Sequence, residues 1–300
     1  MASLGIWTVC TVSYAAPPMN LTASKSCLGP PYLLASFHGG SKISDMNQVY
    51  QYSRDGCLLS SNVLTGGPTL DELRGLLVLP SGSLLVANAN KDSSKLIEYG
   101  ACSSSSLARA YQSTVVGSGG SLVHPYGLAI SGSNVFVSNQ DTYSVVVYSN
   151  GVWSPDLFVQ YTSDDDVRGL TVDGSGVLYV AVEETGVLRY NSSTRSKIGT
   201  IDCDDCIGMF YDSTTNAVFI GSNGKDEVYQ YGVAEGKVVR TFKYTGLSHP
   251  AGLVVYGGAL FVNAQTAGKI LQFDVATGDF VSAIVSSVPD DLEGLTLAVC

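Results

Sequence analysis

A short motif that recurs six times restricts the fold of this chain more than any other feature. Each copy has polar or turn residues, two variable residues and then Gly-Leu or a close variant, as in "DELRGLLV", "HPYGLAI" and "DDVRGLTV". The motif glycines are Gly75, Gly127, Gly169, Gly208, Gly252 and Gly294. They follow one another at intervals of roughly 40 to 50 residues, and a repeat of this length that contains only strand patterns is typical of β-propeller blades.

The sequence inside each repeat predicts four strands. The Gly-Leu strand is followed by a turn rich in Gly and Ser, and then by an apolar strand such as "VLYVAV" or "AVFIGS". A third strand alternates polar and apolar residues and often ends in an aromatic residue, as in "KLIEY" and "EVYQY". This period of two indicates that one face of the strand packs against a neighbouring blade. A fourth, more polar strand completes the unit at the rim.

The two ends of the chain predict how the ring closes. Complete units begin at Asp71, His124, Asp165, Asp204 and His249. Before them, "YLLASF", "NQVYQY" and "CLLSSNVL" supply the second, third and fourth strands of another unit, and the final "DDLEGLTLAVC" supplies only a first strand. Joining these fragments completes one blade and removes the unpaired edges of an open array. We therefore predict an all-β, six-bladed propeller over residues 31–300, preceded by an N-terminal segment over residues 1–30.

The N-terminal segment and the glycosylation motifs indicate an extracellular protein. Residues 1–15 contain an apolar stretch and a small-x-small site at Ser13 and Ala15, which fits a secretory signal. Without cleavage, "LGIWTVCTV" in this segment would form an extra edge strand. Removal of the segment would eliminate Cys10 and leave six cysteines, an even number suited to disulfides. Glycosylation sequons begin at Asn20 and Asn191.

The positions of the six remaining cysteines predict three disulfides. The predicted pairs are Cys27–Cys300, Cys203–Cys206 and Cys57–Cys102. The first pair would join the chain just before the first N-terminal strand to the end of the closing strand beside it, and so would lock the ring. The second pair is a local bridge, because its CxxC spacing leads into a strand rather than a helix. The third would connect similar places in successive blades.

The charge distribution excludes some partners and favours others. The chain has a formal net charge of -10 and no clusters of Lys or Arg, which argues against nucleic acid and anionic membrane surfaces. It has no run of apolar residues long enough for a spanning helix. The acidic residues fall mostly in loops that a propeller places on one face: Asp45, Asp71, Glu72, Asp92, Asp141, Asp164 to Asp166, Glu183, Glu184, Asp202, Asp204, Asp205, Asp226, Glu227, Asp290 and Asp291. Such a face would attract Ca²⁺ or a basic partner; alternatively, these residues only cap turns and maintain solubility.

The residue before each motif glycine is predicted to point toward the central channel. These residues are Arg74, Tyr126, Arg168, Ile207, Ala251 and Glu293. Glu293 and Arg74 fall on neighbouring blades and are expected to form an ion pair, whereas Arg168 is too far around the ring to reach Glu293. With Asn139 and Glu183 added from the loops of the same face, the polar members would bind an anionic or sugar-like ligand. The alternative is that they close the channel.

Two stretches resemble the repeats of NHL propellers, "HPYGLAISGSNVFVSNQDTYSVVVY" and "HPAGLVVYGGALFVNAQTAGKILQF". In six-bladed enzymes of the related gluconolactonase type, a Glu before a Gly on an inner strand holds a divalent metal together with an Asn and an Asp. The resemblance implies that Glu293 and Asn139 would be the first two ligands here. The family's Pro after the Gly is replaced by Leu295, and no Asp stands at the expected ends of the second strands. Lyases of this fold use His on zinc, for which His38 is the candidate.

Two functions follow from these observations. The first is an extracellular binding or structural scaffold whose acidic face engages a protein, a glycan or Ca²⁺. The alternative is a metal-assisted hydrolase, lactonase or lyase with Glu293, Asn139 and His38 at the central channel. The enzyme requires several ligands that converge at the channel mouth, whereas the scaffold requires a closed channel and an exposed contact surface.

Overall fold

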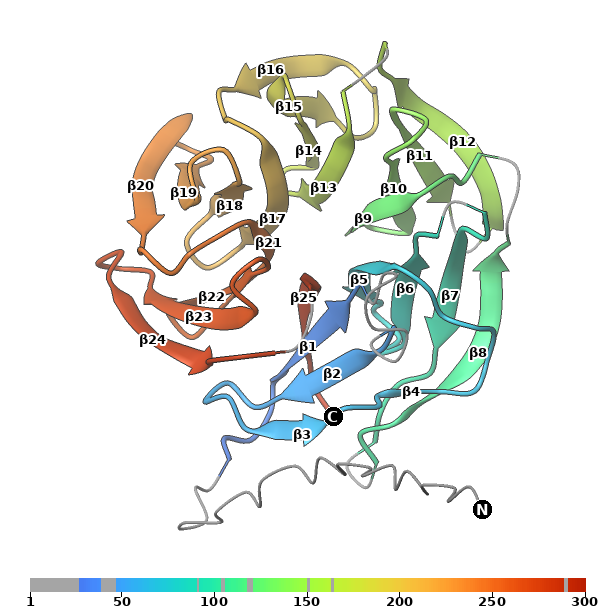
Figure 1. The fold of residues 1–300 in the computed structure, drawn as a ribbon. Coiled ribbons are helices and arrows are strands. Elements are labelled where there is room, and N and C mark those ends of the chain that lie inside the picture. Colours follow the sequence, from blue (N-terminus) through green and yellow to red (C-terminus); the bar gives the residue numbers. More distant parts are fainter. Residues whose placement is uncertain are drawn as a thin grey trace, which may run out of the picture.

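Six small sheets are arranged around a central axis in the computed structural model (Figure 1). It describes residues 27–38, 47–90, 92–103, 106–117, 121–149, 152–162, 165–288 and 291–300, and no helix occurs among them. This arrangement confirms the predicted all-β, six-bladed propeller. The expected signal or edge strand over residues 1–15 and the sequon at Asn20 lie outside the described residues.

Each blade has four strands that run from the axis to the rim. The first blade contains β25 (Leu292–Ala298), β1 (Tyr32–Phe37), β2 (Val49–Tyr52) and β3 (Leu58–Ser60), and the second contains β5 (Leu73–Val78), β6 (Leu84–Asn88), β7 (Lys95–Tyr99) and β8 (Arg109–Val116). The third contains β9 (Pro125–Ser131), β10 (Asn134–Asn139), β11 (Ser144–Ser149) and β12 (Val152–Gln160), and the fourth β13 (Val167–Val172), β14 (Val177–Val182), β15 (Gly186–Asn191) and β16 (Lys197–Ile201). The fifth contains β17 (Cys206–Asp212), β18 (Ala217–Ser222), β19 (Glu227–Gly232) and β20 (Lys237–Lys243), and the sixth β21 (Pro250–Tyr256), β22 (Ala259–Ala264), β23 (Lys269–Asp274) and β24 (Phe280–Val285).

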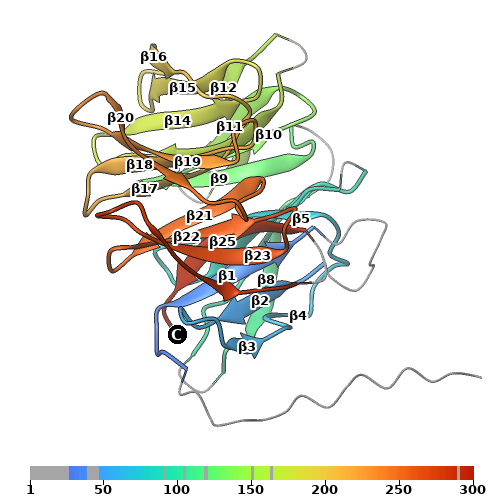
Figure 2. The same ribbon diagram turned by 60° about the vertical axis from the view of Figure 1, so that its left-hand side comes forward.

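The ring closes inside the first blade, as predicted. Strand β25 pairs antiparallel with β1, in a register that places Tyr32 opposite Ala298 and Ala35 opposite Leu295. Strand β25 also contacts β21 of the sixth blade and β5 of the second blade, and both views show it beside β1 (Figure 2). The last strand of the chain is therefore the innermost strand of the blade that the N-terminal strands complete.

A short additional strand strengthens the rim of the second blade. Strand β4 (Leu64–Thr65) belongs to the linker between the first two blades and pairs in parallel with the start of β8. The amide of Arg109 donates a hydrogen bond to the carbonyl of Val63 at 2.7 Å, and the Thr65 hydroxyl donates to the carbonyl of Arg109 at 3.3 Å. The linker thus covers part of an edge that would otherwise expose unpaired backbone groups.

The motif glycines allow neighbouring innermost strands to pack at close range. A methyl group added to any of the six would lie less than 3.0 Å from the carbonyl oxygen of the residue before the next motif glycine in the ring. For example, a methyl group on Gly127 would meet the carbonyl of Arg168, and one on Gly252 would meet the carbonyl of Glu293. The repeat therefore requires glycine because of this contact between blades.

The hydrophobic core lies between the blades. Six clusters of buried side chains each combine residues of two adjacent blades, and together they occupy all six interfaces. In the interface of the fifth and sixth blades, Phe242 contacts Phe219 of its own blade and Phe273 of the next. The alternation of the third strands reflects these contacts, because successive side chains face the blades on either side.

The predicted disulfide Cys27–Cys300 is wrong. Cys27 is joined to Cys57, and their Cα atoms lie 5.8 Å apart. The chain before β1 runs along the turn between β2 and β3, where the amide of Leu28 donates a hydrogen bond to the Asp55 carboxylate at 3.1 Å. This path takes Cys27 away from the closing strand and toward the turn that contains its partner.

The predicted disulfide Cys57–Cys102 is also wrong, whereas the local bridge is present. Cys102 is joined to Cys300 with a Cα separation of 5.3 Å, and Cys203 is joined to Cys206 with a separation of 5.9 Å. Beyond the end of β25 the chain approaches the segment that follows β7, the third strand of the second blade. The closing strand is therefore linked covalently to the neighbouring blade rather than to its own.

Candidate functional site

Two sets of loops form the face of the propeller that we call the top face. One set leads into the first strand of each blade, and the other leaves the second strand. Exposed carboxylates in these loops are those of Asp92, Asp141, Glu184, Asp202, Asp204, Asp226 and Asp291. Asp45, Asp164 and Asp290, which were predicted to lie there, fall outside the described residues. On the opposite, bottom face, Asp173 and Asp212 are buried and accept hydrogen bonds within their turns.

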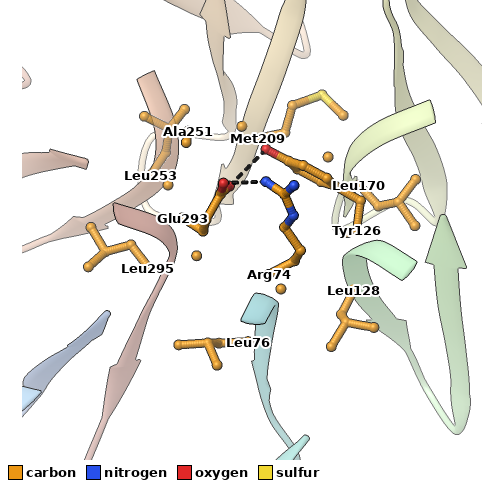
Figure 3. A pocket seen from close by; sticks show the side chains of 16 residues that line it. Arg74, Leu76, Tyr126, Leu128, Leu170, Met209, Ala251, Leu253, Glu293 and Leu295 are labelled. Atoms are coloured by element: carbon orange, nitrogen blue, oxygen red, sulfur yellow. Dashed lines mark hydrogen bonds and ion pairs between the residues drawn. The ribbon is translucent and has the colours of Figure 1, made fainter. Parts of the chain in front are cut away.

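Four side chains fill the top of the central channel, and we call them the axial cluster: Arg74, Tyr126, Arg168 and Glu293. The Glu293 carboxylate is only 2% exposed and forms an ion pair with the Arg74 guanidinium from the neighbouring blade, as predicted. Its other oxygen accepts a hydrogen bond from the Tyr126 hydroxyl at 3.2 Å. Figure 3 shows these three side chains converging over the channel. Both oxygens of Glu293 are thus occupied by donors of the chain itself.

Tyr126 connects the two arginines of the axial cluster. The Arg74 guanidinium lies 5.3 Å and the Arg168 guanidinium 5.8 Å from the centre of the Tyr126 ring, within the range of cation–π attraction. Arg168 does not contact Glu293, as expected, and instead donates to the Glu183 carboxylate at 2.9 Å and to the Asp166 carboxylate at 3.3 Å. Each arginine therefore has its own counterion, and the aromatic ring lies between them.

Burial controls the protonation of the axial cluster. Desolvation raises the pKa of the Glu293 carboxyl, and the Arg74 guanidinium beside it acts in the opposite direction. Burial, followed by the negative charge of Glu293, raises the pKa of the Tyr126 hydroxyl far above its ordinary value of 10.0. The tyrosine is therefore a neutral donor, and the arrangement favours a fixed network over a proton-transfer site.

Below the axial cluster the channel is narrow and apolar. The residue after each motif glycine lines it, and the six are Leu76, Leu128, Leu170, Met209, Leu253 and Leu295 (Figure 3). The remaining cavity has a volume of about 80 Å³. This is far smaller than the several hundred cubic ångströms of an ordinary small-molecule site.

The other predicted site residues differ in their relation to the axial cluster. His38 contacts it, since its Nε2 atom lies 3.0 Å from Nη2 of Arg74. Asn139 does not, because its side chain is fully buried and bonds the backbone of the loop that enters its own blade, at Ser121 and Val123. The structure thus does not place Glu293 and Asn139 in a common ligand set. Among the described residues, no group of three or more His, Cys, Asp or Glu side chains is arranged to hold a metal ion.

Polar residues directly after the second strands form a ring around the channel, and sequence reasoning identified only two of them, His38 and Glu183. The members it missed are Gln140, Asn223 and Gln265, whose side chains also form hydrogen bonds near the channel. Gln265 donates to the Glu293 carboxylate, and Gln140 donates to the Asp166 carboxylate at 2.6 Å. The aligned repeats contained the signal, because all of these residues occupy the same position of the repeat.

The two histidines of the His-Pro motifs hold the entry loops. His124 lies between two blades, with Nδ1 at 3.0 Å from the Asp141 carboxylate and Nε2 at 3.9 Å from that of Glu72. The amide of His249 donates to the Asp226 carboxylate at 3.0 Å. Both histidines have a positive φ of 52°, a left-handed conformation that directs the chain into the first strand.

A hollow on the top face between the fourth and fifth blades gathers several carboxylates around the local disulfide. It is lined by Glu183, Glu184, Asp202, Cys203, Asp204 and Asp205. Asp204 forms an exposed ion pair with Lys225 at 3.1 Å, and the remaining acidic groups give the hollow a negative field. The arrangement can attract a cation or a basic side chain by electrostatics.

Comparisons with known proteins support the fold. No family model and no curated protein matches the sequence. Among solved structures, "Crystal structure of Nidogen/Laminin Complex" is similar with a TM-score of 0.70 and 14% sequence identity, over 90% of this chain and 100% of the matched chain. No helix in the described part of the chain is long and apolar enough to cross a membrane. The similarity extends over nearly the whole ring and concerns the propeller fold.

Proposed function

We propose that this chain is an extracellular, NHL-like propeller that acts as a binding scaffold through its acidic top face. The observation that carries the proposal is the internal pairing of the axial cluster. Arg74, Glu293 and Tyr126 bond one another at the channel mouth, so the exposed chemistry of the top face is that of the carboxylates around it. The structural neighbour was solved as a complex of two proteins, which supports a protein partner for this chain as well.

A basic protein segment is the preferred ligand. The hollow beside the Cys203–Cys206 disulfide presents carboxylates from both sides, and its only exposed ion pair involves Lys225 among the described residues. Ca²⁺ is less favoured, since among the described residues no group of three or more His, Cys, Asp or Glu side chains is placed so that it could hold a metal ion. A glycan is the third ligand class. The three disulfides support an oxidising, extracellular location.

Binding of a defined probe tests the proposal. A synthetic peptide rich in Lys and Arg should bind the protein with an affinity that falls as salt rises, because salt screens exposed charges. The variant Glu184→Gln/Asp202→Asn/Asp204→Asn should weaken binding at least several-fold. The matched bottom-face control is Asp55→Asn/Glu235→Gln/Asp279→Asn, which removes the same number of charges. Equal weakening by both variants would show that net charge, and not the top face, attracts the peptide.

Two further measurements distinguish a basic segment from Ca²⁺ and from a glycan. Calorimetry with CaCl₂ should show no stoichiometric site if a basic segment is the ligand, and an array of sulfated and neutral glycans tests the third class. Binding of a glycan or Ca²⁺ that survives the top-face substitutions would contradict the preferred ligand and place the interaction elsewhere.

A further inference from the structure

Arg109 is a buried cation beside a disulfide. The residue is 1% exposed, and its side chain extends from β8 beneath the second blade. Nη1 donates hydrogen bonds to the carbonyls of Gly82 at 2.7 Å and Gly100 at 3.2 Å, and Nη2 lies 3.1 Å from Sγ of Cys102. Nε is buried without a hydrogen-bond partner. The guanidinium therefore has two carbonyls and one disulfide sulfur as its neighbours.

No carboxylate neutralises Arg109 within the described part of the chain. None of the ion pairs of the described residues includes it. Burial lowers the pKa of its guanidinium, in keeping with the high cost of a buried charge that lacks a partner. The sulfur of Cys102 is uncharged in the disulfide but would carry a full negative charge as a thiolate. Reduction would thus give Arg109 the counterion that it lacks.

We infer that the Cys102–Cys300 disulfide is a thiol-exchange site in which Cys102 is the leaving thiolate. An incoming thiolate attacks Sγ of Cys300, so a new bond forms there while the bond between Cys300 and Cys102 breaks. The electron pair of that bond goes to the Cys102 sulfur beside Arg109. If the attacking reagent is a dithiol, its second thiolate then displaces the Cys300 thiolate, which takes a proton from water. The reagent is oxidised to a disulfide and the protein bridge is reduced.

The direction of attack follows from the stability of the leaving group. A thiol with a lower pKa leaves faster, and a neighbouring cation lowers the pKa of a thiol. Titratable side chains on β7, the strand that precedes Cys102, include Glu98 and Tyr99. On β7, the carboxylate of Glu98 accepts a hydrogen bond from the Ser83 hydroxyl at 2.8 Å. Burial raises the pKa of Tyr99 to about 12, which keeps it neutral, and β4 contributes no titratable residue.

The other two disulfides have the opposite electrostatic environment. Sγ of Cys57 lies 3.9 Å from the Asp55 carboxylate, and the Cys203–Cys206 bridge borders the acidic hollow on the top face. A nearby negative charge disfavours a thiolate. The chain thus contains matched controls for the proposed effect of Arg109. Exchange at Cys102–Cys300 would leave β25 paired with β1, so the ring would remain closed while a cysteine on the bottom face became available for a mixed disulfide.

The pKa of the isolated Cys102 thiol provides the main test. In Cys300→Ser, the rate of iodoacetamide alkylation at Cys102 should follow a pKa at least one unit below the ordinary value of about 8.5. Adding Arg109→Gln should return the pKa to 8.5 or above, and Arg109→Lys should keep it lowered. The control Cys27→Ser, which frees Cys57 beside Asp55, should show no lowering.

Reduction of the intact protein provides a second test. Limited dithiothreitol, acid quenching and peptide mass mapping should show the Cys102–Cys300 bridge reduced several-fold faster than Cys27–Cys57. A difference of one unit in leaving-group pKa changes the rate by at most about tenfold. The mixed disulfide formed with glutathione should be on Cys300. An ordinary pKa for Cys102 in a folded Cys300→Ser protein, or attachment of glutathione to Cys102, would overturn the inference. If Arg109→Gln does not fold, the Cys300→Ser protein and its Arg109→Lys derivative still decide the question.

Discussion

Gly294 packs against the main-chain carbonyl of Arg74, and a methyl group at position 294 would lie 2.5 Å from that oxygen. The same carbonyl accepts a hydrogen bond from the Ser36 hydroxyl at 2.6 Å, and this hydroxyl accepts one from the Gly294 amide at 2.8 Å. Ser36 lies on β1, Gly294 on the closing strand and Arg74 on the next blade. One small contact thus joins the two ends of the chain to their neighbour in the ring.

Replacement of this glycine should destabilise ring closure. We expect Gly294→Ala to lower the free energy of unfolding by about 1 to 3 kcal/mol, because the backbone on either side must move to admit the methyl group. Gly117→Ala is the control, since no atom of the described residues lies within 4 Å of a methyl group at that position. Urea unfolding followed by circular dichroism would measure both, and equal midpoints would show that the close contact is not required.

The ion pair of the axial cluster should behave as a unit. Glu293→Leu leaves Arg74 without its partner, and breaking a buried pair from one side costs about 3 to 5 kcal/mol. The double variant Arg74→Met/Glu293→Leu should recover much of this loss, because no unpaired charge remains. Chemical unfolding of the two variants tests this. A double variant no more stable than Glu293→Leu would contradict the assignment of the loss to an unpaired arginine.

The two motif histidines should make stability depend on pH. Burial lowers the pKa of His124 and of His249 below the ordinary value of 6.5. Between the lowered pKa and 6.5 the unfolded chain binds more protons than the folded protein, so stability rises with pH in this window. We expect the two histidines to contribute fully to the free energy of unfolding above pH 6.5. This contribution should decrease progressively as the pH falls toward their pKa values in the folded protein.

A double variant isolates this effect from the carboxylates. His124→Asn/His249→Asn removes the titration and suits the positive φ of both positions, since Asn tolerates the left-handed conformation. Its unfolding free energy should depend less on pH between 7.5 and 5.5 than that of the native protein. NMR titration of the histidine side chains would give the pKa values directly. Identical pH profiles would exclude the histidines as the cause.

The two disulfides that join distant parts of the chain, Cys102–Cys300 and Cys27–Cys57, should contribute unequally to stability. The Cys102–Cys300 bridge spans a sequence separation of 198 and the Cys27–Cys57 bridge one of 30. In the chain-entropy model the longer loop contributes more, by about 1.6 kcal/mol. The variant Cys102→Ser/Cys300→Ser should therefore unfold at lower denaturant than Cys27→Ser/Cys57→Ser. The reverse order would indicate that native-state contacts, and not loop closure, set the stabilisation.

Most of the fold was predictable because its determinants are local and repeated. The motif glycines mark the innermost strands, and the incomplete units at both ends require closure within one blade. The pairing of Arg74 with Glu293 followed from adjacency in the ring. These inferences need only the order of strands around an axis, which the repeat specifies.

The disulfides and the role of Asn139 were less predictable for a physical reason. Cysteine pairing depends on the path of irregular segments, and the segment with Cys27 bends along the β2–β3 turn instead of following β25. The resemblance to gluconolactonase-type propellers implied that Asn139 was a metal ligand, but its amide bonds its own entry loop. The burial of Arg109 had no sequence signal, since its partners are the backbone carbonyls of Gly82 and Gly100.

The disulfides have a mechanical consequence. Tension applied to the protein through residues 27 and 300 would reach covalent bonds before it reached the hydrogen bonds between β1 and β25. Force applied at residue 27 would pass through the disulfide to Cys57 and into the β2–β3 turn. Force applied at residue 300 would pass through the disulfide to Cys102 and into the second blade. The hydrogen bonds between β1 and β25 would then carry little of the applied force. Reduction of either bridge would transfer the force to them. A ring clamped in this way would resist force with a strength that depends on the redox state of its disulfides.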